Sequence, residues 1–179
     1  MSYDDNPFSE YQQEEEETPL HDQHPQQNTF TFTYESEQPK MITISSEFDS
    51  GNIALCQDTA PYSYSIFMSE DGLPYSAKGH YRTWFYFSVT GVPTGQALIF
   101  AIKNMNNQGR LYKAGLKPVY RVLPTAQKRW KRIPEGVECG KGSEGFCITF
   151  SFTCTYSQDD VYYFAFSYPF SLEECLKQG

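Results

Sequence analysis

The sequence predicts an all-β protein: an antiparallel β-sandwich with a disordered acidic N-terminal tail and the start of a short C-terminal helix. Three observations support this prediction. Apolar and polar residues alternate with a period of two in many short runs, which is typical of half-buried strands. Turn sequences such as EDGLP and GVPTG separate these runs. Aromatic residues make up 17% of the chain, so large rings are available for a core between two sheets.

Composition divides the chain into three parts. Residues 1–27 are rich in Glu, Gln, Asp and Pro and poor in branched aliphatic residues, so they cannot bury enough apolar surface to offset chain entropy, and we expect a disordered tail. We assign residues 28–170 to the sandwich. In residues 171–179, Ser171 is a suitable N-cap and Glu173 and Glu174 suit a first helical turn. We expect a linker helix to begin there and to lead to a catalytic domain absent from this chain.

The strand assignments follow the period-two pattern in chain order. The first run, TFTFTY, places Phe30, Phe32 and Tyr34 on one face, and later runs repeat this alternation. The run 161–168 is apolar on both faces, which indicates a central strand covered on both sides. We expect CGKGSEG (139–145) to be a flexible hairpin loop. The predicted strands are 29–34, 41–48, 62–68, 81–89, 96–102, 117–123, 128–133, 146–155 and 161–168.

Alternation also predicts which side chains form the core. In FCITFSFTCT (146–155), apolar residues alternate with Ser and Thr, so one face of this strand lies in the core and the other in water. Cys147 and Cys154 belong to this run, and we expect both to be buried as small hydrophobic residues. Trp84, Phe85 and Phe87 are expected in the core of a central strand.

Charge is distributed unevenly along the chain, whose formal net charge is -8. Residues 1–50 contain twelve acidic residues and one base, whereas residues 51–179 contain ten acidic residues and thirteen bases. Between Asp71 and Glu135 there are eleven Lys and Arg and no acid. Such a field attracts polyanions or acidic peptides, although a solvated face, or one paired with the tail or a missing domain, remains the alternative. Nucleic acid is not an expected partner, because a tail containing EEEE would repel its backbone.

The residues give no argument for catalysis by this chain itself. The histidines are His21, His24 and His80, and no HExxH, HxxE or paired CxxC is present, so we predict no metal site. A GxSxG elbow and glycine-rich phosphate loops are also missing. The odd number of cysteines and the absence of an apolar signal segment favour reduced thiols in the cytosol. No apolar run reaches the ~18–20 residues needed to span a membrane, so no membrane association is expected.

Four motifs in order resemble a known family. They are FDSGNIALC (48–56), RTWFYFSVTG (82–91), the run 102–134 and YYFAFSYPFSLEEC (162–175). Together they are similar to the β-sandwich domain that precedes the catalytic domain of cytosolic carboxypeptidases, and most similar to the cytosolic carboxypeptidase 5-like group. The resemblance covers roughly residues 41–176 and leaves the acidic tail unmatched.

The resemblance implies a zinc metallocarboxypeptidase that removes glutamates from polyglutamylated tubulin and other acidic protein tails. It places such a protein in the cytoplasm, in association with microtubules or cilia. In that family the zinc ligands and the general-base glutamate lie in the following domain. We therefore expect no cofactor in this chain, no activity of the chain alone, and a catalytic domain as partner. A stand-alone, non-catalytic module that binds acidic protein tails is the alternative.

Two groups of candidate site residues follow. Asp49 and Asn52 belong to the turn sequence DSGN, which lies near the interface with the catalytic domain in the resembling family, so we expect them to serve docking. The acidic tail (EEEE, 14–17) is either a solubilising extension or a mimic of the substrate that competes in cis. The residues expected to bind an acidic peptide are Arg110, Lys113, Lys117, Arg121, Lys128, Arg129, Lys131 and Arg132.

Overall fold

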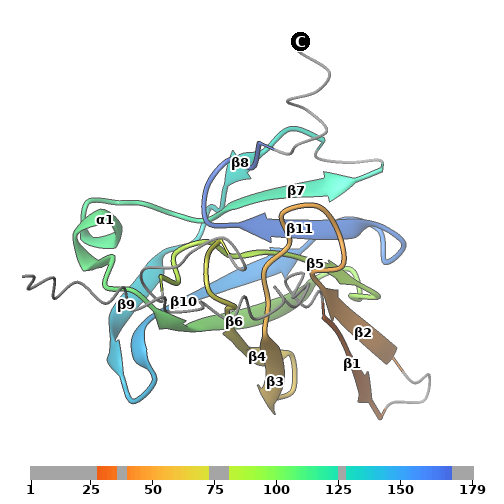
Figure 1. Cartoon of the computed structure of the whole chain (residues 1–179). Coiled ribbons are helices and arrows are strands. Elements are labelled where there is room, and N and C mark those ends of the chain that lie inside the picture. Colours follow the sequence, from red (N-terminus) through yellow and green to blue (C-terminus); the bar gives the residue numbers. More distant parts are fainter. Residues whose placement is uncertain (1–27, 36–39, 73–80, 125–127, 171–179) are drawn as a thin grey trace, which may run out of the picture.

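A computed structural model describes residues 28–35, 40–72, 81–124 and 128–170. Two stacked β-sheets form the domain (Figure 1), so the predicted all-β sandwich is confirmed. The predicted disordered tail and the predicted helix start at 171–179 lie outside the described residues. The six-stranded sheet has the order β1 (Thr29–Tyr34), β2 (Lys40–Ser45), β5 (Tyr86–Thr90), β11 (Val161–Ala165), β7 (Val119–Leu123), β8 (Lys131–Arg132). The five-stranded sheet has the order β3 (Leu55–Ala60), β4 (Ser63–Phe67), β6 (Gln96–Met105), β10 (Gly145–Cys154), β9 (Val137–Gly142).

One strand pair differs from the predicted antiparallel arrangement. Strands β4 and β6 are parallel, with Ser63 opposite Ile99 and Phe67 opposite Lys103. The chain crosses from β4 to β5 in the other sheet and returns as β6, so β6 runs in the same direction as β4. The other paired strands are antiparallel. A crossover of this kind leaves no trace in the alternation of the sequence.

Each predicted strand overlaps an observed one, but three elements were missed. Strand β3 is an edge strand in which only Cys56 is buried, so its residues show no alternation. Strand β9 is the other edge of the same sheet and occupies part of the predicted loop 139–145. Helix α1 (Gly109–Lys113) has five residues, too few to display a helical period.

Aromatic rings hold the two sheets together. Phe100 of β6 lies between Phe87 of β5 and Phe164 of β11, with a ring-centroid distance of 5.2 Å to each. Phe150 of β10 lies 5.5 Å from Phe100, and all four side chains are at most 2% exposed. Rings of this size each bury about 150–250 Å². The predicted core of aromatic side chains is therefore present, with Phe100 at its centre.

The ring contacts also determine which edges of the two sheets coincide. Tyr120 of β7 packs against Phe152 of β10 at a centroid distance of 4.6 Å. The next strands outward are β8 in one sheet and β9 in the other, so both lie at the same side of the sandwich. Phe32 of β1 packs against Tyr64 of β4 at the opposite side, at 5.0 Å.

Removing the central ring is expected to destabilise the domain strongly. Phe100→Ala deletes a fully buried side chain that contacts both sheets, and such a substitution costs about 3–5 kcal/mol. Ile99→Ala is the matched control, because Ile99 precedes Phe100 on β6 but is 44% exposed; its expected cost is below about 1 kcal/mol. Urea unfolding measures both, and equal losses would contradict the assignment of Phe100 to the core.

Candidate acidic-peptide and docking sites

Helix α1 and strand β9 lie at one side of the sandwich, and β8 is the outermost strand of the other sheet at that side. Helix α1 packs against β9 in the five-stranded sheet. Its Tyr112 points inward, is 6% exposed, and contacts the ring of Phe146 at 6.1 Å. Burial raises the pKa of Tyr112, and the positive charge of Arg132 on β8 acts in the opposite direction on that pKa. Arg132 of β8 is thus close enough to α1 for its charge to act on Tyr112.

Seven of the predicted peptide-binding residues come from α1, from β8 or from the segments beside these two elements. Lys117 links α1 to β8: its Nζ donates to the carbonyl of Pro134 at 2.7 Å, and its own carbonyl accepts from Arg132. Both partners are neutral carbonyls, so the two positive charges are not compensated. We call the following residues the basic edge: Arg110, Lys113, Lys117, Lys128, Arg129, Lys131 and Arg132. All but the half-buried Lys117 are exposed.

The charges of the basic edge are largely uncompensated by acids. The ion pair between Arg82 and Glu70 lies elsewhere in the fold, at 2.6 Å. Within the described ranges, no carboxylate forms an ion pair with Arg110, Lys113, Lys117, Lys128, Lys131 or Arg132. An uncompensated group of cations produces a local positive potential, even though the whole chain is acidic.

Arg121 differs from the other predicted peptide-binding residues. It lies on the outer face of the six-stranded sheet, where its guanidinium carbon is 4.8 Å from the ring centroid of Trp130 and 5.1 Å from that of Tyr163. Its Nη2 donates to the hydroxyl of Tyr86 at 3.1 Å. Cation–π contacts of this kind are worth about 0.5–2 kcal/mol. The structure thus shows Arg121 joining strands through an aromatic cluster.

That outer aromatic cluster consists of Phe48, Trp84, Tyr86, Trp130 and Tyr163. Trp84 was predicted to be in the core with Phe85 and Phe87, and this prediction is wrong, since Trp84 is on the opposite face. Its Nε1 donates to the carbonyl of Ser50 at 2.8 Å.

The predicted docking turn lies beside the outer aromatic cluster. Ser50 has a φ of 65°, so the left-handed residue of this turn is Ser50 and not a glycine. Gly51 is required for a different reason, because a Cβ there would lie 2.2 Å from the carbonyl oxygen of Ser46. Asn52 is 9% exposed, and its amide donates to the carbonyls of Trp84 at 2.8 Å and Ser69 at 3.3 Å. Asp49 is exposed.

An open pocket of about 500 Å³ adjoins this turn. It is polar and acidic on one side and aromatic on the other. Tyr168 and Phe170, which follow β11, are 55% and 61% exposed. The pocket is lined by Ser50, Gly51, Asn52, Glu70, Asp71, Gly72, Trp84, Tyr168 and Phe170.

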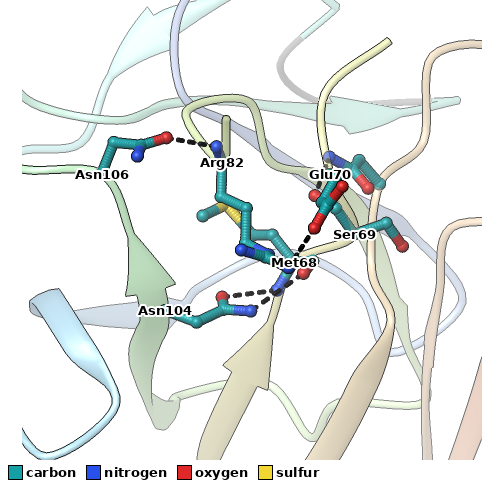
Figure 2. A network of polar contacts seen from close by, with 7 residues as sticks. Met68, Ser69, Glu70, Arg82, Asn104 and Asn106 are labelled. Carbon is teal, nitrogen blue, oxygen red and sulfur yellow. Dashed lines mark hydrogen bonds and ion pairs between the residues drawn. The ribbon is translucent and has the colours of Figure 1, made fainter. Parts of the chain in front are cut away.

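A polar network fixes the chain behind this pocket (Figure 2). The carboxamide of Asn104 accepts from the backbone N–H of Met68 at 2.9 Å and donates to its carbonyl at 3.0 Å. The side-chain oxygen of Asn106 accepts from the backbone N–H of Arg82. Arg82 Nη2 in turn pairs with Glu70 Oε1 at 2.6 Å. The end of β6 is therefore tied to two segments that line or flank the pocket.

Asp71, which lines this pocket, is held by backbone hydrogen bonds. Its carboxylate accepts from the backbone N–H of Thr83 at 2.7 Å and of Trp84 at 3.2 Å. Burial nevertheless raises the pKa of Asp71, and these hydrogen bonds and the charge of Arg82 oppose the rise.

The described residues offer no donor set for a metal ion. Within these residues, no three His, Cys, Asp or Glu side chains come close enough together to hold one. The three histidines of the sequence, His21, His24 and His80, lie outside the described residues. In the part of the chain that the structure covers, no helix has the length and apolarity required to cross a membrane.

This fold and its surfaces correspond to a known class of domain. The family model for the cytosolic carboxypeptidase N-terminal domain matches residues 44–166, which span most of the sandwich. The chain belongs to this family, so the resemblance found in the sequence is confirmed.

Individual relatives agree with this assignment. The chain is 30% identical over 142 residues to cytosolic carboxypeptidase 6 of Mus musculus, with 76% of this chain and 25% of the relative covered. It is 31% identical over 158 residues to cytosolic carboxypeptidase-like protein 5 of Rattus norvegicus, with 75% and 19% covered. The chain thus spans a quarter or less of these relatives. A metallo-carboxypeptidase structure from Pseudomonas aeruginosa, in complex with (2-guanidinoethylmercapto)succinic acid, shares the fold at a TM-score of 0.51 and 20% identity, covering 75% of this chain and 32% of that one.

The raised pKa of Asp71 predicts the sign of a pH effect. The folded state holds this proton more tightly than the unfolded state, so the contribution of Asp71 to the free energy of unfolding is greatest below the ordinary pKa of 3.8 and falls as pH rises through the raised value. Asp71→Asn removes this dependence. Urea unfolding gives the free energy of unfolding of both proteins. The measurements start at about pH 3, below the reference Asp pKa of about 3.9, and continue to higher pH. If the free energy of unfolding of the wild type minus that of the variant increases with pH, the raised pKa of Asp71 is contradicted.

Proposed function

We propose that this chain is the accessory N-terminal domain of a zinc carboxypeptidase that removes glutamates from acidic protein tails. In this proposal the sandwich supports the catalytic domain and its basic edge attracts the substrate. The observation that carries the proposal is the positive charge of the basic edge in a member of the cytosolic carboxypeptidase family. Six of its residues form no ion pair within the described ranges: Arg110, Lys113, Lys117, Lys128, Lys131 and Arg132. Polyglutamylated tubulin, the substrate that the resemblance implies, has the complementary charge.

The basic edge contributes mainly to association. Positive potential increases the rate at which an acidic chain arrives and orients it, while single exposed charges add modestly to affinity. Screening limits the range of this attraction to about 8 Å at physiological ionic strength. A chain that carries many glutamates engages several of these charges at once, so such a tail is preferred to an isolated carboxylate.

The proposed docking surface is the pocket beside residues 49–52. Tyr168 and Phe170 line it and are the last aromatic residues that the structure describes, so a domain that follows them in sequence would begin at this surface. The relatives extend well beyond the region matched by this chain, which leaves room for such a domain. Asp49 is the exposed member of the predicted docking pair, and Asn52 shapes the pocket wall through its internal hydrogen bonds.

In this proposal the following domain supplies the chemistry. The described residues have no donor set for zinc, and the proposal therefore assigns the zinc ligands and the general base to the catalytic domain. The cytoplasm, at microtubules or cilia, is the corresponding location. A stand-alone module that binds acidic tails is the second candidate, because it would use the same basic edge; binding to a catalytic domain separates the two.

Neutralising part of the basic edge is expected to weaken binding of a polyglutamate peptide. Lys128→Gln/Lys131→Gln removes two exposed charges, each worth about 0.2–1 kcal/mol, so Kd should rise about two- to thirtyfold at low salt. Lys40→Gln/Lys103→Gln is the matched control, with the same change in net charge at positions away from this edge. Fluorescence anisotropy measures both. Equal weakening by the two variants would show that only net charge matters.

A charge placed in the docking pocket is expected to weaken binding to a catalytic domain. Phe170→Glu introduces an acid beside Glu70 and Asp71, whereas Met41→Glu makes the same kind of change on β2; both residues are 61% exposed. The partner is the catalytic domain of a cytosolic carboxypeptidase, added in trans, and calorimetry gives the affinity. At least a tenfold loss for Phe170→Glu alone is expected. No binding by the wild type would favour the stand-alone module.

A further inference from the structure

A second pocket opens within reach of the basic edge. It has a volume of about 490 Å³ and lies between the start of α1 and the hairpin of β9 and β10. Pockets of this size accommodate small ligands or a few side chains. It is lined by Asn107, Gly109, Lys113, Cys139, Gly140, Lys141 and Phe146, among which there is no acid.

The lining combines positive charge with an apolar surface. Lys113 from α1 and Lys141 from β9 both line the pocket, so it has a cation on each of the two elements that border it. The ring of Phe146, 9% exposed, provides the apolar contact. The oxygen of Asn107 accepts from the backbone N–H of Gly109 at 3.1 Å, and its Nδ2 donates to no other residue within the described ranges.

This combination matches one kind of ligand. A carboxylate accepts hydrogen bonds from ammonium and amide donors and gains from their charge. The methylene groups of a glutamate side chain lie well against an aromatic ring, since their removal from water is favourable. A phosphate would use the cations but would gain nothing from the ring.

We propose that this pocket is a carboxylate subsite, which holds the glutamate or aspartate side chains of an acidic peptide. This rests on the proposed function, and it adds a definite place where the peptide is held after the basic edge attracts it. The carboxylates can come from a peptide in trans or from Glu14–Glu17 of the chain itself, and both sources have the same chemistry.

Cys139 provides a direct readout of occupancy, because its thiol lines the pocket. Cys147 is the internal control: it is also half-buried, but lies outside the pocket lining, on the outer face of β10. The full chain is treated with iodoacetamide, and mass spectrometry gives the alkylation rate of each cysteine. A polyglutamate peptide at saturation should slow the alkylation of Cys139 at least fivefold and leave the alkylation rate of Cys147 unchanged.

Variants test the role of Lys141. Lys141→Gln should abolish protection of Cys139 and weaken binding of the peptide at least fivefold. Lys141→Arg keeps the charge and should restore both protection and binding. Lys103→Gln has the same charge change as Lys141→Gln and should preserve protection. Anisotropy gives the affinity independently of thiol reactivity. If the peptide binds but Cys139 is unprotected and Lys141→Gln behaves like Lys103→Gln, the pocket is overturned while the proposed function stands. If the peptide does not bind at all, both are overturned.

A further arm identifies the source of the carboxylates. In the full chain with Glu14–Glu17 changed to Gln, an alkylation rate of Cys139 higher than in the wild type without peptide would show that the tail occupies the pocket. An unchanged rate, together with protection by added peptide, would assign the pocket to a ligand in trans. Either result supports the carboxylate subsite.

Discussion

The contact between aromatic rings of the two sheets is the constraint on which the rest of the structure depends. Phe100 and Phe150 of one sheet interlock with Phe87 and Phe164 of the other. Because these rings have a fixed shape, they define how the sheets stack. The stacking places β8 and β9, the terminal strands of the two sheets, at the same side of the sandwich, and helix α1 packs against β9. Basic residues that are far apart in sequence are thereby brought to one surface.

The sequence predicted the parts of the fold that depend on alternation. Phe150, Phe152 and Cys154 were correctly assigned to the core because they share one face of β10, and Cys147 was assigned wrongly because it lies on the other face. Edge strands β3 and β9 were missed since neither has a regularly buried face. These misses have one cause: periodicity reports burial, and edge strands are scarcely buried.

The candidate site was predictable in composition but not in geometry. The acid-free interval in the sequence indicated a basic surface, yet only the fold separates Arg121, held between Trp130 and Tyr163, from the exposed lysines. Similarly, Asn104 belongs to a sequence run typical of a loop. Its side-chain amide nevertheless makes the two backbone hydrogen bonds with Met68 that a neighbouring strand would otherwise make. Both roles depend on contacts between residues distant in sequence.

The basic edge and the docking pocket adjoin each other, and they differ in charge because acidic residues line the pocket. Arg132 belongs to the basic edge, and its guanidinium carbon lies 5.2 Å from the ring centroid of Tyr168, which lines the docking pocket. A domain docked at the pocket would therefore lie next to a peptide held along the basic edge. The sandwich would thus present acidic tails to a neighbouring active site.

Mapping a bound polyglutamate peptide by NMR tests the central claim most directly. The account predicts that backbone amide shifts change at Lys113, Lys131 and Gly140, around α1, β8 and β9, and that β1–β4 are unaffected. Changes concentrated on β1–β4, or spread evenly over both sheets, would contradict the claim that one edge of this sandwich binds acidic chains.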